Sequence, residues 1–98
     1  MPTDAIIKNK AVFLFTMADC RPCKNFKPTF TEVSQMPEFF EVDFSMKDAT
    51  QEPELANAMG IMSVPATVML LDGQPVSMYP GELTKELFIE KIKNDLKV

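Results

Sequence analysis

The residues AVFLFTMADCRPC at positions 11–23 carry most of the information on the architecture of this chain. Residues 11–16 form a continuous apolar run rich in β-branched and aromatic side chains, which predicts a central strand buried on both faces. Residues 17–20 are expected to form the loop that leaves this strand. A helix is predicted from Arg21, since a proline such as Pro22 is tolerated in the first turn. The chain therefore passes from a buried strand directly into a helix.

The predicted helix runs to Gln35. Phe26, Phe30 and Val33 recur at the spacing of one helix face, so this face should pack against a sheet. Pro28 lies inside the helix and is expected to kink it, because proline lacks the N–H that a helix interior uses. Core packing is the expected role of five phenylalanines in the chain: Phe13, Phe15, Phe26, Phe30 and Phe44.

The rest of the chain continues the alternation of strands and helices. The predicted elements are a strand over 39–44, a polar loop over 45–51, a short helix over 53–59, a strand over 66–71, a turn at Asp72-Gly73, a strand over 74–79 and a final helix capped by Thr84. The final helix is expected to direct four residues to the core: Leu87, Phe88, Ile92 and Leu96. Thr3 or Asp4 is also expected to cap a short helical turn over residues 5–8.

This order of elements predicts an α/β fold. Two strands joined by a helix should be parallel through a right-handed crossover, whereas the last two strands should form an antiparallel hairpin. The result is a mixed four-stranded β-sheet flanked by helices on both faces. With 98 residues, the chain 1–98 is expected to be a single domain.

Charge and composition exclude several classes of function. Lys and Arg number 10 against 14 Asp and Glu, a formal net charge of −4, which argues against nucleic acid and against an anionic membrane surface as partners. Apolar residues make up 46% and charged residues 24%, as in ordinary globular proteins. Histidine is absent, which excludes histidine-based acid–base catalysis and histidine-containing zinc sites.

No membrane span or signal peptide is predicted. The longest apolar run covers residues 11–15, whereas a span needs about 20 residues. The first residues, Met1-Pro2-Thr3-Asp4, have neither a basic region nor an apolar stretch before a cleavage site. The expected compartment is therefore the cytoplasm.

Cys20 and Cys23 are the two cysteines of the chain. A disulfide between them would close too short a loop to stabilise the fold, so a redox role is the better interpretation. Cys20 should lie at the start of a helix, where free backbone N–H groups and the helix dipole stabilise a thiolate. Cys23, one turn later on the side facing the sheet, should be less exposed. The alternative, half of a metal site, would need about four ligands in a chain without histidine. No metal and no cofactor are therefore predicted.

The residues beside the two cysteines should tune their redox balance. Arg21 and Lys24 place positive charges near the Cys20 thiolate, which favours the reduced form and makes the pair more oxidising. Asp19 opposes them with a negative charge, and Pro22 stiffens the turn. The sum of these effects is left open.

A second motif, Met62-Ser63-Val64-Pro65-Ala66-Thr67, lies before a predicted strand. A proline in this place, after an extended segment, is a candidate cis-proline, although an ordinary trans bond is the commoner case. Without an N–H on Pro65, the preceding backbone is available to pair with a substrate strand. The flexible apolar Met62 suits a surface that binds many partners. Met62, Val64 and Pro65 are therefore the predicted substrate-binding residues.

Together these motifs resemble the thioredoxin family, more closely than the glutaredoxins. The matching residues are Cys20-Arg21-Pro22-Cys23-Lys24, Pro28 five residues later, residues 60–67 with their proline, and then Gly73 and Gly81 at eight-residue steps. The resemblance covers residues 11–98. The aromatic Cys-Pro-Tyr-Cys motif and the paired glycines of glutaredoxins are not seen.

The sequence departs from the family pattern at four positions. Asp19 replaces the usual tryptophan before the first cysteine, and Arg21 replaces a glycine. Leu14 stands where thioredoxins carry a buried aspartate that accepts the proton of the resolving thiol, and Phe39 stands in place of the lysine that pairs with it. Both members of that pair are absent together, which is self-consistent because a lone buried partner would be costly.

The resemblance implies a thiol–disulfide oxidoreductase that reduces disulfide-containing proteins. Cys20 would attack the substrate and Cys23 would resolve the mixed disulfide. A thioredoxin-reductase-like enzyme or glutathione would supply electrons, and the chain is expected to be monomeric. Two alternatives remain open at this stage: a glutaredoxin-like enzyme recycled by glutathione, and a non-catalytic accessory protein that uses the same surface for binding.

Overall fold

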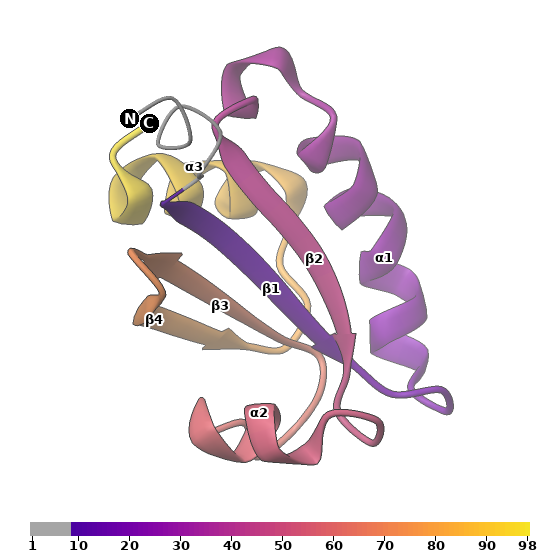
Figure 1. Cartoon of the computed structure of the whole chain (residues 1–98). Coiled ribbons are helices and arrows are strands. Elements are labelled where there is room, and N and C mark those ends of the chain that lie inside the picture. Colours follow the sequence, from indigo (N-terminus) through magenta and orange to yellow (C-terminus); the bar gives the residue numbers. More distant parts are fainter. Residues whose placement is uncertain (1–8) are drawn as a thin grey trace.

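Strand β1 (Lys10–Thr16) is central to a four-stranded sheet of order β2-β1-β3-β4 (Figure 1). The computed structural model describes residues 9–98. Strand β2 (Val42–Asp48) runs parallel to β1, and β3 (Ala66–Leu71) runs antiparallel to it on the other side. Strand β4 (Gln74–Pro80) pairs antiparallel with β3. The mixed sheet predicted from the sequence is confirmed.

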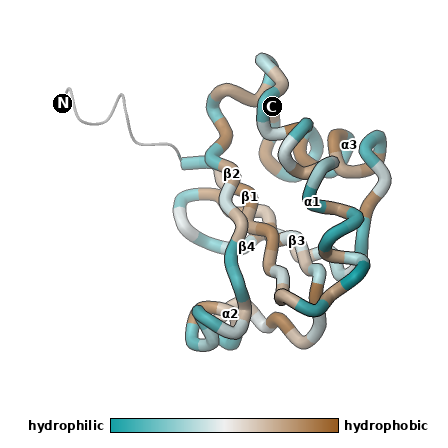
Figure 2. Tube along the Cα trace, turned by 90° about the vertical axis from the view of Figure 1, so that its right-hand side faces the viewer, coloured by the Kyte–Doolittle hydropathy of each residue, from teal (hydrophilic) through white to brown (hydrophobic). Residues whose placement is uncertain are grey.

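Helices cover both faces of this sheet. Helices α1 (Arg21–Ser34) and α3 (Lys85–Leu96) lie on one face, and the short helix α2 (Pro53–Ala58) lies on the other (Figure 1). In Figure 2, hydrophobic residues follow β1 through the centre of the molecule, whereas hydrophilic and hydrophobic residues alternate along α1 and α3. This is the pattern expected of a buried strand between amphipathic helices.

The larger core lies under α1 and α3 and is built around phenylalanines. Phe88 of α3 packs edge-on against Phe26, with ring centroids 5.3 Å apart, and stacks on Phe30 at 5.8 Å. Phe44 of β2 joins the same cluster, 5.7 Å from Phe30. Aromatic pairs at such distances add about 0.5–1.5 kcal/mol each beyond burial, so they fix α1 against both α3 and the sheet.

The second strand lies further along the chain than predicted. The sequence favours a strand over 39–44 and a loop over 45–51, but β2 starts at Val42 and continues to Asp48. Phe39 belongs instead to a short 3₁₀ helix, Pro37–Phe39, and its side chain is buried in the core. Polar residues are compatible with β2 because it is an edge strand, where half of the side chains face solvent.

Two smaller predictions are also corrected. Leu87 was expected in the core but is 38% exposed, because Phe88 occupies the inward position of this turn. Phe13 is half-buried on the α2 side of the sheet, where Lys47 lies 4.9 Å from its ring. The helical turn predicted over residues 5–8 lies outside the described residues. The hairpin turn at Asp72-Gly73 is confirmed, with φ of 53° and 80°, as a tight two-residue turn requires.

Helix α3 is tied to the edge of the sheet by one carboxylate. Asp95 accepts hydrogen bonds from the hydroxyls of Ser77, at 2.7 Å, and of Tyr79, both on β4. Burial raises the pKa of the Tyr79 phenol above its ordinary value, and its hydrogen bond to Asp95 raises it further.

This arrangement predicts a loss of stability at alkaline pH. The pKa of Tyr79 is higher in the folded protein than in the unfolded chain. The contribution of Tyr79 to the free energy of unfolding is therefore complete below about pH 10, and it is lost as the pH rises through the pKa of the folded state. Urea unfolding across this range should show the decline. Tyr79→Phe should flatten it, and an identical decline in the variant would contradict the assignment.

Candidate active site

The sulfur of Cys20 caps helix α1. Cys20 has an extended backbone, with φ −124° and ψ 107°, and its Sγ accepts a hydrogen bond from the backbone N–H of Cys23 at 3.1 Å. The first N–H groups of a helix have no partner within the helix, so a side chain at this position satisfies one of them. The sulfur thus lies at the positive end of α1, where a thiolate is stabilised.

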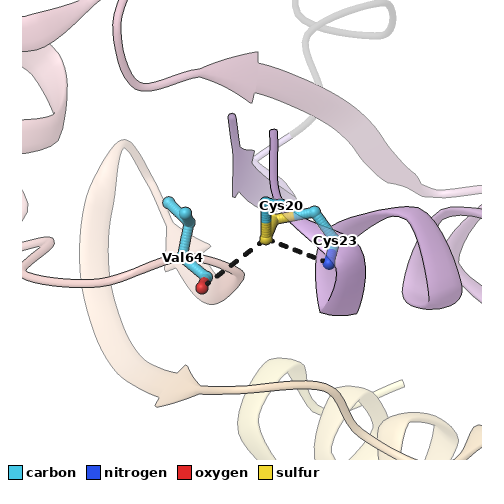
Figure 3. The surroundings of a disulfide bond; sticks show 3 residues. All are labelled: Cys20, Cys23 and Val64. Atoms are coloured by element: carbon cyan, nitrogen blue, oxygen red, sulfur yellow. Dashed lines mark hydrogen bonds between the residues drawn. A yellow bond between two sulfur atoms is a disulfide. The ribbon is translucent and has the colours of Figure 1, made fainter. Parts of the chain in front are cut away.

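Cys20 and Cys23 are joined in a disulfide (Figure 3). Their Cα atoms are 5.2 Å apart, within the usual range for such a bond. Cys23 is fully buried, whereas Cys20 is 9% exposed. The sulfur of Cys20 is therefore the one that a second molecule reaches first.

A distant segment meets this disulfide. The carbonyl oxygen of Val64 lies 3.8 Å from Cys20 Sγ, although the two residues are 44 positions apart in the sequence (Figure 3). The following Val64–Pro65 peptide bond is cis. The Pro65 carbonyl in turn accepts a hydrogen bond from the N–H of Gly81 at 2.8 Å, which holds the segment against the end of β4.

Two shallow hollows lie on this side of the molecule, and one of them is lined by Cys20. The first, of about 430 Å³, surrounds Cys20 itself and is lined by residues 17–22, Thr50 and Val64. The second, of about 240 Å³, is largely apolar and shares Met17 and Val64 with the first. Met62, at its edge, is 95% exposed. Of the predicted substrate-binding residues, Val64 thus contacts the disulfide, Met62 lines the apolar hollow next to it, and Pro65 is buried.

The charged residues predicted to tune the cysteines surround the start of α1. Asp19, Arg21 and Lys24 are exposed and line a further hollow with Cys20. No ion pair within residues 9–98 includes any of them. Their charges are therefore exposed beside the reactive sulfur rather than neutralised by partners.

The buried surroundings of the disulfide are apolar where the family resemblance implies an acid. Leu14 is fully buried on β1, and Phe39 is buried beneath the same face. Neither side chain can accept a proton. The buried position on β1 thus holds Leu14 rather than an acid. Phe39 was matched to the lysine on the expectation that the second strand covers residues 39–44, but it lies on the 3₁₀ helix before β2.

One buried hydroxyl was not identified from the sequence. Thr67 of β3 is fully buried, and its Oγ1 has no hydrogen-bond partner in the described structure. Leaving such a group unpaired costs about 1–3 kcal/mol. Thr67 ends the motif noted in the sequence at residues 62–67, but a threonine in the run ATVMLL is also typical of ordinary strands and does not indicate an unpaired hydroxyl.

The described residues contain neither a group of three metal-binding side chains nor a membrane-spanning helix. Across residues 9–98, His, Cys, Asp and Glu do not gather in threes at metal-binding distance. In the same part of the chain, every helix is too short or too polar to cross a bilayer.

Comparison with known families identifies relatives of this chain. The model of the family described as Thioredoxin matches residues 3–94. A thioredoxin-like protein derived from the SPbeta prophage of Bacillus subtilis (strain 168) is 39% identical over 77 residues, covering 70% of this chain and 88% of that protein. A chloroplastic thioredoxin of Arabidopsis thaliana is 30% identical over 79 residues, 81% of this chain, which spans 45% of that protein's length.

The fold is likewise similar to solved structures. The thioredoxin of Malassezia sympodialis matches with a TM-score of 0.82 at 25% identity, covering 90% of this chain and 76% of the other. The match covers most of the chain, so it supports the fold as a whole.

The positive charge of Arg21 and the negative charge of Asp19 are expected to shift the reduction potential of the disulfide in opposite directions. Arg21→Gln should shift the reduction potential of the disulfide to more negative values by on the order of 10 mV, because the variant loses a charge that stabilises the thiolate. Equilibration with glutathione buffers followed by thiol alkylation measures this potential.

Asp19→Asn is the matched control and should shift the potential in the opposite direction. Both shifts should shrink at high salt, since exposed charges are screened. Shifts of the same sign in the two variants would show that local charge does not set the potential.

Proposed function

Since this chain belongs to the thioredoxin family and is a thiol–disulfide oxidoreductase, we propose that it reduces disulfide bonds in protein substrates. The observation that carries this proposal is the position of Cys20. Its sulfur caps α1 and lies next to the Val64 carbonyl, and both residues line a hollow that is open to solvent. A substrate disulfide can therefore approach one sulfur of the pair while the other stays covered.

In the first step, the Cys20 thiolate attacks one sulfur of the substrate disulfide. A bond forms between Cys20 Sγ and that sulfur, and the substrate S–S bond breaks. The second substrate sulfur leaves as a thiolate and takes a proton from solvent. The helix N-terminus favours the attacking thiolate, because its N–H groups and dipole stabilise negative charge on Cys20.

In the second step, Cys23 resolves the mixed disulfide. Its sulfur attacks Cys20 Sγ, the intramolecular disulfide forms, and the remaining substrate sulfur departs as a thiol after taking up a proton. Two electrons have then passed from the cysteine pair to the substrate. The burial of Cys23 supports this order, since a covered sulfur reacts with its neighbour more readily than with a second protein.

We assign the docking of the substrate to the segment 62–65. An extended peptide lying beside Val64 would bring its disulfide next to Cys20, and backbone pairing of this kind tolerates many sequences. Met62 and the apolar hollow next to it offer contacts for substrate side chains of varied shape.

The oxidised protein must be reduced again before the next cycle. A thioredoxin-reductase-like enzyme or glutathione is the proposed electron donor. We propose the cytoplasm as the compartment, because thiols are kept reduced there, and a monomer as the active form.

The assigned roles predict different outcomes for the two serine variants. Cys20→Ser should abolish turnover, because the attacking sulfur is lost. Cys23→Ser should still attack the substrate but accumulate a mixed disulfide, because the resolving sulfur is lost. Reduction of insulin by the protein and a chemical donor measures turnover, and non-reducing electrophoresis detects the trapped species.

The double variant, Cys20→Ser with Cys23→Ser, is the control for both. It should fold, since the short disulfide loop adds little stability, and it should trap nothing. Failure of Cys23→Ser to trap any substrate would contradict the proposed roles. Full biological function of the double variant would instead support a non-catalytic role.

A further inference from the structure

The hydroxyl of Thr67 has no partner while the two cysteines are bonded to each other. Thr67 is fully buried, and within residues 9–98 its Oγ1 is the one buried side-chain nitrogen or oxygen without a hydrogen bond. Valine has nearly the same shape and would fill this place without an unpaired polar atom. A buried polar group of this kind requires an explanation, and a role in another state of the protein is one.

The register of the sheet places this hydroxyl on the same face as Cys23. Thr67 pairs with Leu14, and paired residues of antiparallel strands direct their side chains to one face. Leu14 belongs to the core under α1 and α3, whereas Val68, the next residue of β3, belongs to the core under α2. Cys23 is the first buried residue of α1 on the side that packs against this face.

The position along the strand places Thr67 at the end of the sheet that carries the disulfide. Val64 contacts Cys20, and Thr67 is the second residue after Pro65, about 7 Å along an extended chain. Leu14, its partner on β1, is likewise two residues before the end of that strand. The hydroxyl and the Cys23 sulfur therefore lie on the same face and at the same end of the sheet, although in the oxidised form Thr67 Oγ1 makes no hydrogen bond to that sulfur.

Other groups on this face are engaged elsewhere or lack polarity. The buried residues of α3 are Phe88, Ile92 and Leu96, all apolar. Tyr79 of β4 donates a hydrogen bond to the carboxylate of Asp95 on α3, so these two titratable groups are already paired. From β2, Asp48 accepts hydrogen bonds from Thr50, with Lys27 of α1 as its nearby cation. Thr16 is the other buried polar residue on this face, and it retains 5% exposure.

We propose that the Thr67 hydroxyl donates a hydrogen bond to the Cys23 sulfur during the resolving step. This proposal rests on the resolving role of Cys23 proposed above. As the Cys23 thiol gives up its proton, the O–H of Thr67 stabilises the negative charge that develops on the sulfur. The sulfur then bonds to Cys20 Sγ, the bond from Cys20 to the substrate breaks, and the departing substrate thiolate takes up the proton. The hydroxyl keeps its own proton throughout.

Thr67→Val tests this role directly. The reduced protein is mixed with the aromatic disulfide 5,5′-dithiobis(2-nitrobenzoate), and the coloured thiol is followed in a stopped-flow instrument. The first phase reports attack by Cys20 and the second reports resolution by Cys23. In Thr67→Val the second phase should be about tenfold slower at neutral pH, and its pH profile should move to higher pH by about one unit. The first phase should be unchanged.

Two variants serve as controls. Thr67→Ser keeps the hydroxyl and should retain the second phase within about twofold. Thr16→Val removes the other buried hydroxyl of this face and should also leave the second phase unchanged. In urea, the oxidised Thr67→Val protein should be at least as stable as the unmodified protein, because the variant removes an unpaired polar group.

Three results would overturn the proposal. The first is a second phase and pH profile in Thr67→Val identical to those of the unmodified chain. The second is equal slowing in Thr67→Ser or Thr16→Val, which would indicate packing rather than the hydroxyl. The third is a Thr67→Val protein that is less stable in urea and in which attack by Cys20 and resolution by Cys23 are slowed equally. If the unmodified chain released only one equivalent of the coloured thiol, the resolving role of Cys23 would be contradicted, and this proposal with it. If it released two equivalents and Thr67→Val had no effect on either phase, this proposal alone would be overturned.

Discussion

The hydrogen bond from the Cys23 backbone N–H to the Cys20 sulfur joins the fold to the chemistry. It exists because β1 ends at Thr16 and α1 begins at Arg21, so that the sulfur between them caps the helix. The same N–H that stabilises the start of the helix also stabilises negative charge on the sulfur. Any movement of α1 relative to β1 would disturb both, which is why the packing of α1 matters to reactivity.

That packing is supplied by residues far from the disulfide. The stacked rings of Phe30 and Phe88 hold α1 against α3, and Phe26 extends the contact toward the buried cysteine. On the other side of the reactive sulfur, the Val64 carbonyl is held by strand pairing of β3 and by the bond from Gly81 to Pro65. The sulfur therefore lies between two rigid elements, while the exposed Met62 and the charges around Cys20 remain free to set specificity and redox balance.

The sequence predicted those parts of this arrangement that depend on periodicity or on local motifs. Strand β1 and helix α1 were recognisable because a buried apolar run and a helical stripe of phenylalanines leave strong patterns. The end of β2 was misplaced because an edge strand needs backbone pairing rather than apolar side chains, so the polar residues 45–48 gave no strand signal. The start was placed too early because the apolar Phe39 and Phe40 resemble the beginning of a strand. Leu87 was misassigned because an apolar residue next to the buried stripe of a helix can lie on either side of its border, and here Phe88 and Ile89 contact the core while Leu87 is 38% exposed.

The sequence suggested a binding role for the segment around Pro65, but it is the resemblance to a family that implied its proximity to Cys20. Local patterns place residues on elements, but they do not bring together segments separated by 44 positions. The orphaned hydroxyl of Thr67 lay beyond both kinds of inference. It becomes visible only once the register of β3 against β1 is known and its surroundings are found to lack a partner.

The pairing of Leu14 with Thr67 explains how this site can do without a buried acid. A carboxylate in this layer would need a buried cation to remain charged. A hydroxyl is neutral at every pH at which the protein is folded, so it needs no such partner. Its unpaired state in the oxidised form costs far less than an unpaired charge would. Under the proposed role of Thr67, the chain combines an apolar core with a neutral hydroxyl that stabilises the Cys23 sulfur as its charge changes during the reaction.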